Sequence, residues 1–183
     1  MFPPLHLVMR RLAAALLCCA CACVPAWADE PADINRLFAA GHSAEAMARL
    51  DQLLAQRPRD SQLRFQKGTF LAELQRSAEA MDIFTQLTVD YPEIPEPYNN
   101  LAVLYAARGE YDKARAALEA ALRANPNYAV AHQNLGDIQT QLARQSYARA
   151  LQLDPSNPLL PPKLALLREI VKPVEAAAKR PTP

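Results

Sequence analysis

Apolar residues recur at intervals of three and four along most of the chain, with polar residues between them. The segment Tyr111–Leu122 illustrates the pattern, because Ala114, Leu118 and Ala121 fall in one register. This spacing is the period of an amphipathic helix. The 183 residues include only four glycines, and no alternating run of β-branched residues is long enough to indicate a strand. The pattern therefore predicts an all-α fold.

The helical pattern itself repeats along the chain. Residues 61–94 align with residues 95–128 without a gap. The alignment pairs Gly68 with Ala102, Ala80 with Ala114, Phe84 with Leu118, and Pro92 with Pro126. A repeat of about 34 residues is typical of helix pairs, which cannot bury their apolar faces alone and must stack on their neighbours. We expect the small Ala80 and Ala114 to let two helices approach closely.

The same frame continues in both directions, to Gly41 and Pro58 before the aligned segments and to Gly136 and Pro155 after them. It predicts a repeat domain over residues 29–158, with units at about 27–60, 61–94, 95–128 and a shortened 129–157. Prolines at 58, 92, 126 and 155 are expected to end the second helix of each unit, because proline cannot continue the hydrogen-bond ladder. Asp60 is a suitable N-cap for the helix that follows it.

The fourth unit departs from the pattern. The interval from Pro126 to Pro155 is shorter by five than the interval from Pro92 to Pro126. The missing residues fall around 140–145, where a turn should separate two helices. Either that turn is very tight, or the two helices run together as one.

A capping helix is expected after the last unit. Pro161 and Pro162 can open a helix, and Leu164, Leu167 and Val171 follow at helical spacing. We predict the capping helix within residues 159–178, beginning near Pro162, and a disordered tail at 179–183.

The aligned residues resemble the tetratricopeptide repeat (TPR), whose signature has a bulky residue, Leu-Gly, an aromatic, Ala-x3-Phe and a terminal proline. The best copy reads Tyr98-x2-Leu101-Ala102-x2-Tyr105, then Ala114-x3-Leu118 and Pro126. The resemblance implies a right-handed superhelical solenoid of stacked antiparallel helix pairs. In this family the first helix of each pair lines a concave face, and peptides bind there.

Carried over through the alignment, the resemblance places ten residues in such a peptide-binding groove. They are Asn35, Phe65, Gln66, Thr69, Asn99, Asn100, Val103, Gln133, Asn134 and Asp137. The set is rich in amides, which offer both a donor and an acceptor to the backbone of an extended peptide. Alternatively, these amides brace neighbouring helices or face solvent, and the sequence leaves both interpretations open.

Some family members grip a C-terminal carboxylate with lysine and arginine on this face. The matching positions here hold Gln62, Gln66, Glu96, Asn99 and Asn100. A carboxylate clamp is therefore not expected, and the predicted ligand is an internal, extended or helical segment of another protein.

Residues 1–28 have the order of a secretory signal peptide. Arg10 and Arg11 precede an apolar run at residues 12–24, and the small-x-small site Ala26-Trp27-Ala28 follows. The run is shorter than the ~20 residues that a permanent span needs. We predict export to the periplasm with cleavage after Ala28. All four cysteines lie in this segment, so a lipid-anchored form is a less favoured alternative, and the rest of the chain can form no disulfide.

Charge and motifs limit the chemistry. Two of the 20 Lys and Arg residues precede Ala28, which leaves 18 basic against 19 acidic residues and argues against nucleic acid as a partner. From Thr140 onward the sequence contains seven basic and three acidic residues. We interpret this end as a solvated basic surface, with an anionic wall or lipid surface as the alternative.

No phosphate loop, serine elbow or paired zinc histidines occur in the sequence. His42 falls in an inter-helix turn, and His132 takes the bulky packing position that Tyr98 fills one repeat earlier. We therefore predict no enzyme activity, no cofactor, no metal site and no small-molecule substrate.

The predicted function is that of an exported periplasmic scaffold, which binds a peptide segment of another envelope protein through its amide-rich groove. Two alternatives remain open. One is an assembly or dimerisation module that uses its convex or C-terminal surface, as a homo-oligomer. The other is a lipid-anchored outer-membrane factor, and membrane contact is expected only in that lipidated form.

Overall fold

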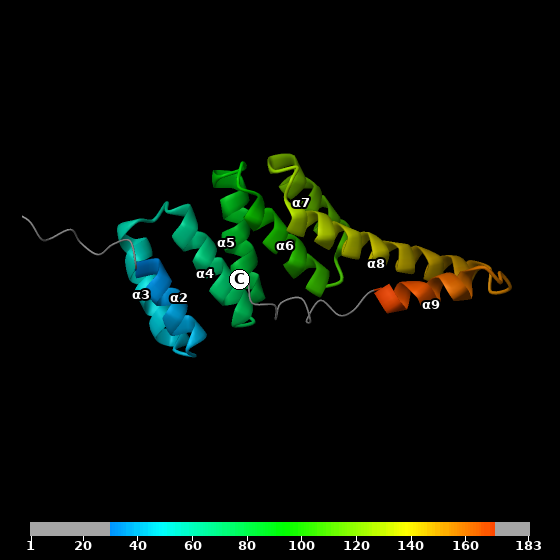
Figure 1. The fold of residues 1–183 in the computed structure, drawn as a ribbon, viewed down its shortest axis with the longest axis horizontal. Coiled ribbons are helices and arrows are strands. Elements are labelled where there is room, and N and C mark those ends of the chain that lie inside the picture. Colours follow the sequence, from blue (N-terminus) through cyan, green and yellow to red (C-terminus); the bar gives the residue numbers. More distant parts are fainter. Residues whose placement is uncertain (1–29, 171–183) are drawn as a thin grey trace, which may run out of the picture. The chain divides into compact units, whose positions relative to one another are not determined.

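A computed structural model describes residues 30–170, and the predicted signal peptide and residues 171–183 lie outside that range. Eight α-helices and no strand occur in the described part (Figure 1). They are α2 (Glu30–Ala39), α3 (Ser43–Gln56), α4 (Ser61–Glu73), α5 (Ser77–Asp90), α6 (Pro95–Ala107), α7 (Tyr111–Ala124), α8 (Ala129–Leu153) and α9 (Leu160–Ile170). The all-α prediction is confirmed. The chain divides within α3 into a unit that ends at Ala46 and a unit that begins at Met47, and each is described by itself.

In the N-terminal unit, α2 leads through a tight turn into the first residues of α3. Ile34 on α2 and Ala46 on α3 are fully buried. The turn contains Gly41 at φ +86°, a left-handed conformation that glycine adopts without steric cost.

The helix ends follow the local chemistry that the sequence predicts. Helices α3, α5, α7 and α8 each end two residues before a proline, at positions 58, 92, 126 and 155. The carboxylate of Asp60 accepts hydrogen bonds from the backbone N–H groups of Gln62 and Leu63, both at 3.1 Å. Asp60 is therefore the N-cap of α4, as predicted.

The turns inside the first three helix pairs share one geometry. Gly41, Gln75 and Gly109 occupy matching positions in consecutive units, and all three have positive φ. In each turn the next N–H donates to a carbonyl five residues earlier: His42 to Leu37, Arg76 to Leu71 and Glu110 to Tyr105, at 3.0, 2.8 and 2.9 Å. This closure satisfies carbonyl groups at the end of the first helix.

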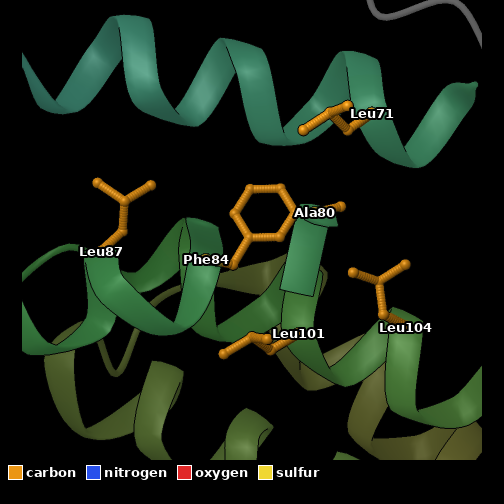
Figure 2. Close-up of a cluster of buried hydrophobic side chains, with 6 residues drawn as sticks. All are labelled: Leu71, Ala80, Phe84, Leu87, Leu101 and Leu104. Carbon is orange, nitrogen blue, oxygen red and sulfur yellow. The ribbon is translucent and has the colours of Figure 1, made fainter. Parts of the chain in front are cut away.

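The core of the C-terminal unit begins where α5 packs between α4 and α6. Figure 2 shows the cluster, with the Phe84 ring directed from α5 towards α4. Its buried members are Leu71 on α4, Ala80, Phe84 and Leu87 on α5, and Leu101 and Leu104 on α6. A second cluster of buried residues on α6, α7 and α8 includes Ala114, Leu118 and Ile138.

Successive pairs fill the same space with different side chains. A Cβ added to Gly68 would lie 2.7 Å from the Phe84 ring, so the phenylalanine requires a glycine opposite. One repeat later the matching residues are Ala102 and Leu118, both buried, so that a larger residue on the first helix faces a smaller one on the second. The repeat conserves the filled volume rather than the residue type.

Helix α8 is continuous over 25 residues. Of the two alternatives for the fourth unit, the structure has the two helices running together. Figure 1 shows α8 extending beyond α7, with α9 folded back along it, and α8 contacts α6, α7 and α9. A Cβ added to Gly136 would meet no atom within 4 Å, because no second helix returns to pack against it.

Helix α9 begins at Leu160, two residues before the predicted start at Pro162. Leu160 and Leu164 are buried, and α9 contacts α8. The predicted continuation of the capping helix to residue 178 and the tail at 179–183 lie outside the described residues.

Candidate functional site

The ten candidate residues lie on first helices of the helix pairs. Asn35 is exposed on α2, in the N-terminal unit. The other nine belong to the C-terminal unit, and we call them the candidate face. They are Phe65, Gln66 and Thr69 on α4, Asn99, Asn100 and Val103 on α6, and Gln133, Asn134 and Asp137 on α8. Helix α6 contacts α8 directly, and α4 and α6 share the core cluster of Figure 2.

Two amides of the candidate face bind each other. The side-chain N–H of Asn134 donates to the side-chain oxygen of Asn99 at 2.8 Å. Asn99 is only 5% exposed, so this bond satisfies a buried acceptor and ties α6 to α8. For Asn99 and Asn134, the structure therefore agrees with the interpretation that these amides brace neighbouring helices.

The three residues on α4 are half-buried. The Phe65 ring packs on the core, with its centroid 5.6 Å from that of Phe84 and the rings inclined at 55°. The hydroxyl of Thr69 donates to the carbonyl of Phe65, one turn earlier, at 3.1 Å. Much of this part of the face is thus committed to packing within α4 and α5.

The accessible part of the candidate face lies on α6 and α8. Asn100 and Val103 are half-buried, whereas Gln133 and Asp137 are exposed. Glu96, one turn before Asn100, is exposed as well. Burial, and then the negative charge of Glu96, raise the pKa of the Tyr128 phenol above its ordinary value. Amides and carboxylates together give this part of the face acceptor-rich chemistry.

Two basic residues of α4 form ion pairs with carboxylates on α3 and α5, which are second helices of their pairs. The ammonium of Lys67 lies 2.6 Å from the Asp51 carboxylate on α3, and the guanidinium of Arg64 lies 2.6 Å from the Asp90 carboxylate on α5. Arg64 and Lys67 are therefore occupied by partners outside the candidate face.

The prediction for His132 was wrong in one respect. The side chain is exposed rather than packed, and its Nε2 lies 2.9 Å from the carbonyl oxygen of Pro126. The imidazole is too short to fill the volume that the Tyr98 ring takes one repeat earlier, and it binds the preceding loop instead.

Two contacts were not anticipated from the sequence. The Asn99–Asn134 bond joins positions 35 residues apart, one more than the repeat, and Glu96 lies near Tyr128. The signal for the first was present in Asn99-Asn100 and Gln133-Asn134, which put amides at matching places in consecutive units.

Within residues 30–170, no group of three or more His, Cys, Asp or Glu is arranged to hold a metal ion. Among the helices of this same range, none combines the length and apolar character needed to cross a membrane.

Comparison with family models identifies the family of this chain. Two models of the tetratricopeptide repeat match residues 34–95 and 95–138. The chain belongs to the TPR family. The matches end within α8, so the second half of this helix and α9 lie beyond the part that follows the family pattern.

Solved TPR structures share the fold at low identity. The first TPR domain of human RPAP3 matches with a TM-score of 0.58 at 19% identity, covering 64% of this chain and 93% of that one. TTC0263 of Thermus thermophilus matches at 0.57 and 22%, covering 81% and 84%. MamA matches at 0.55 and 18%, covering 74% and 82%. These likenesses support the fold, an all-α TPR solenoid.

Proposed function

We propose that this TPR protein is an exported scaffold of the periplasm, which binds a segment of another envelope protein along the candidate face. The observation that carries the proposal is the hydrogen bond between Asn99 and Asn134. It fixes α6 against α8, so that Asn100, Gln133 and Asp137 are held on a preformed surface. Preorganisation lowers the entropic cost of binding.

The chemistry of the accessible residues defines the ligand. Asn100 and Gln133 can each donate to and accept from the backbone of an extended peptide, and Val103 offers apolar contact between them. Glu96 and Asp137 favour a segment that carries lysine or arginine. Capture of a C-terminal carboxylate is disfavoured, because Arg64 and Lys67 already bind Asp90 and Asp51.

Export is the part of the proposal that rests on residues 1–28, with cleavage after Ala28. Intact-mass measurement of the protein from the cell envelope tests it. We expect the mass of a chain that starts at Asp29. A mass increased by acyl chains at a cysteine would replace the soluble form with the lipid-anchored alternative.

The binding surface is tested with Asn100→Ala combined with Gln133→Ala, in a crosslinking pull-down from the native envelope. Asn134 stays unchanged in this variant, because its removal would disturb the α6–α8 tie. We expect partner recovery to fall about tenfold or more, as two peptide-binding groups are lost, with the helical circular dichroism unchanged.

The matched control replaces two exposed amides outside α4, α6 and α8, Gln52→Ala with Asn127→Ala. It should bind like the wild type. Equal capture by the face variant and the wild type would show that the candidate face is not the binding surface.

A further inference from the structure

The outer side of α9 is aliphatic at positions where the end of a repeat stack is normally polar. Leu159, Leu166 and Ile170 are 64%, 62% and 63% exposed. Lys163, which is also exposed, Leu166 and Ile170 are spaced by three and four residues, so they form one stripe along α9, and Leu159 lies in the turn just before the helix begins. We call these four residues the α9 stripe. The neighbouring side of the helix, with Leu160 and Leu164, is the one buried.

This end of the protein is also basic. From Thr140 onward the chain contains Arg144, Arg149, Lys163, Arg168, Lys172, Lys179 and Arg180 against Asp154, Glu169 and Glu175. Three of them, Lys172, Lys179 and Arg180, come after Ile170 in the sequence and lie outside the described residues. An exposed aliphatic stripe with a basic surround is the composition of a helix that lies at an anionic membrane interface.

We propose that the α9 stripe binds the surface of an anionic phospholipid bilayer. Leu159, Leu166 and Ile170 enter the boundary between headgroups and acyl chains, and Lys163 meets the lipid phosphates. Arg168 lies on the opposite side of the helix and adds positive charge close to the membrane surface. The helix lies along the membrane rather than crossing it, since α9 has only 11 residues. This surface is separate from the candidate face, and the inference does not depend on the proposed function.

The position of Lys163 favours a bilayer over a second copy of the chain as the binding partner of the α9 stripe. It falls in the middle of the stripe, with its ammonium 5.1 Å from the centre of the Tyr147 ring on α8. Burial between two protein copies would strip the ammonium of water, a cost that only a well-placed carboxylate such as that of Glu169 on the facing copy could offset. At a bilayer surface the aliphatic stem of a lysine lies along apolar groups while the charge reaches the phosphates.

Vesicle co-sedimentation tests the proposal. A chain that begins at Asp29 is used, since it keeps every described helix and lacks the apolar run at residues 12–24. We expect binding to vesicles of equal parts phosphatidylcholine and phosphatidylglycerol, weakened by salt, and much less binding to phosphatidylcholine alone.

Leu166→Gln combined with Ile170→Gln should weaken binding to the mixed vesicles about tenfold or more, because two interfacial side chains lose their apolar contact. Lys163→Gln combined with Arg168→Gln should remove most of the preference for phosphatidylglycerol. All four side chains are exposed, so the thermal midpoint should stay near that of the wild type. The matched controls are Val89→Gln, at an aliphatic residue 75% exposed on α5, and Arg123→Gln on α7.

Three results would overturn the proposal. One is absence of wild-type binding to the mixed vesicles, and another is equal binding by the Leu166→Gln/Ile170→Gln variant. The third is a dimer in static light scattering that this same variant abolishes, because the stripe would then be covered by a second copy.

Discussion

Gly68 on α4 leaves the space that the Phe84 ring of α5 fills. Replacing Gly68 with alanine should lower the free energy of unfolding by about 1–3 kcal/mol, because the new methyl group would lie 2.7 Å from a ring that is buried on all sides. Urea denaturation measures the change. Phe84→Leu in the same chain copies the Ala102–Leu118 arrangement and should restore part of the loss. A neutral Gly68→Ala would contradict the observed packing.

Gln75 takes the left-handed turn position that glycine holds at Gly41 and Gly109, at φ +60°. A side chain in this conformation costs roughly 1–2 kcal/mol, and glycine would lose ~0.5–1 kcal/mol in chain entropy. Gln75→Gly should therefore raise the free energy of unfolding by about 0.5–1 kcal/mol, measured in urea. Gln75→Ala keeps the strained conformation and serves as the control, with little change expected.

The bond between Asn134 and Asn99 gives a prediction that separates bracing from binding. Asn134→Ala leaves the buried oxygen of Asn99 without its donor, which should reduce the free energy of unfolding by about 1–2 kcal/mol. Asn100→Ala, at a half-buried amide, should change it by less than about 0.5 kcal/mol. In a double-mutant cycle, the combined loss of Asn99→Ala and Asn134→Ala should be smaller than the sum of the single losses. Additive losses would mean that the amides do not interact.

At the scale of helices, most boundaries could be predicted from the sequence because single residues determine them. Proline is strongly unfavourable in a helix interior, and the Asp60 carboxylate caps α4. The join within α8 was left open, although a signal was available. Gly41, Gln75 and Gly109 mark three turns, and the next position in the series is Ala143, inside a run without glycine or proline from Asp137 to Asp154. Such a run favours an unbroken helix.

Gly136 tests the continuity of α8. It is a helical residue with open space beside it, so Gly136→Ala should raise the free energy of unfolding by about 0.5–1 kcal/mol through helix propensity alone. If α8 instead turned and packed Tyr147 against Gly136, as Phe84 packs on Gly68, the same substitution would be destabilising. Urea denaturation of Gly136→Ala beside Gly68→Ala distinguishes the two arrangements by the opposite signs of their effects.

At the scale of the whole chain, the repeat frame predicted which helices carry the candidate face but not the state of each side chain. The frame relates residues at matching places in consecutive units, whereas Asn99 and Asn134 meet across two helices at a spacing one residue longer than the repeat. That offset depends on how α6 and α8 pack, which no single repeat encodes. The exposed stripe on α9 was missed for a related reason, because the spacing of Leu164 and Leu167 accounted for only one side of the capping helix.

Helix α8 carries part of the candidate face and is also the helix on which α9 packs. Gln133 and Asp137 lie in its first half, and Tyr147, below Lys163, lies in its second half. The helix is ~37 Å long at about 1.5 Å per residue, so a peptide on one surface and a bilayer under the other need not compete. We therefore expect Leu166→Gln/Ile170→Gln to lose vesicle binding and keep partner capture, and Asn100→Ala/Gln133→Ala to do the reverse. Loss of both activities in either variant, with helicity intact, would show that one surface serves both.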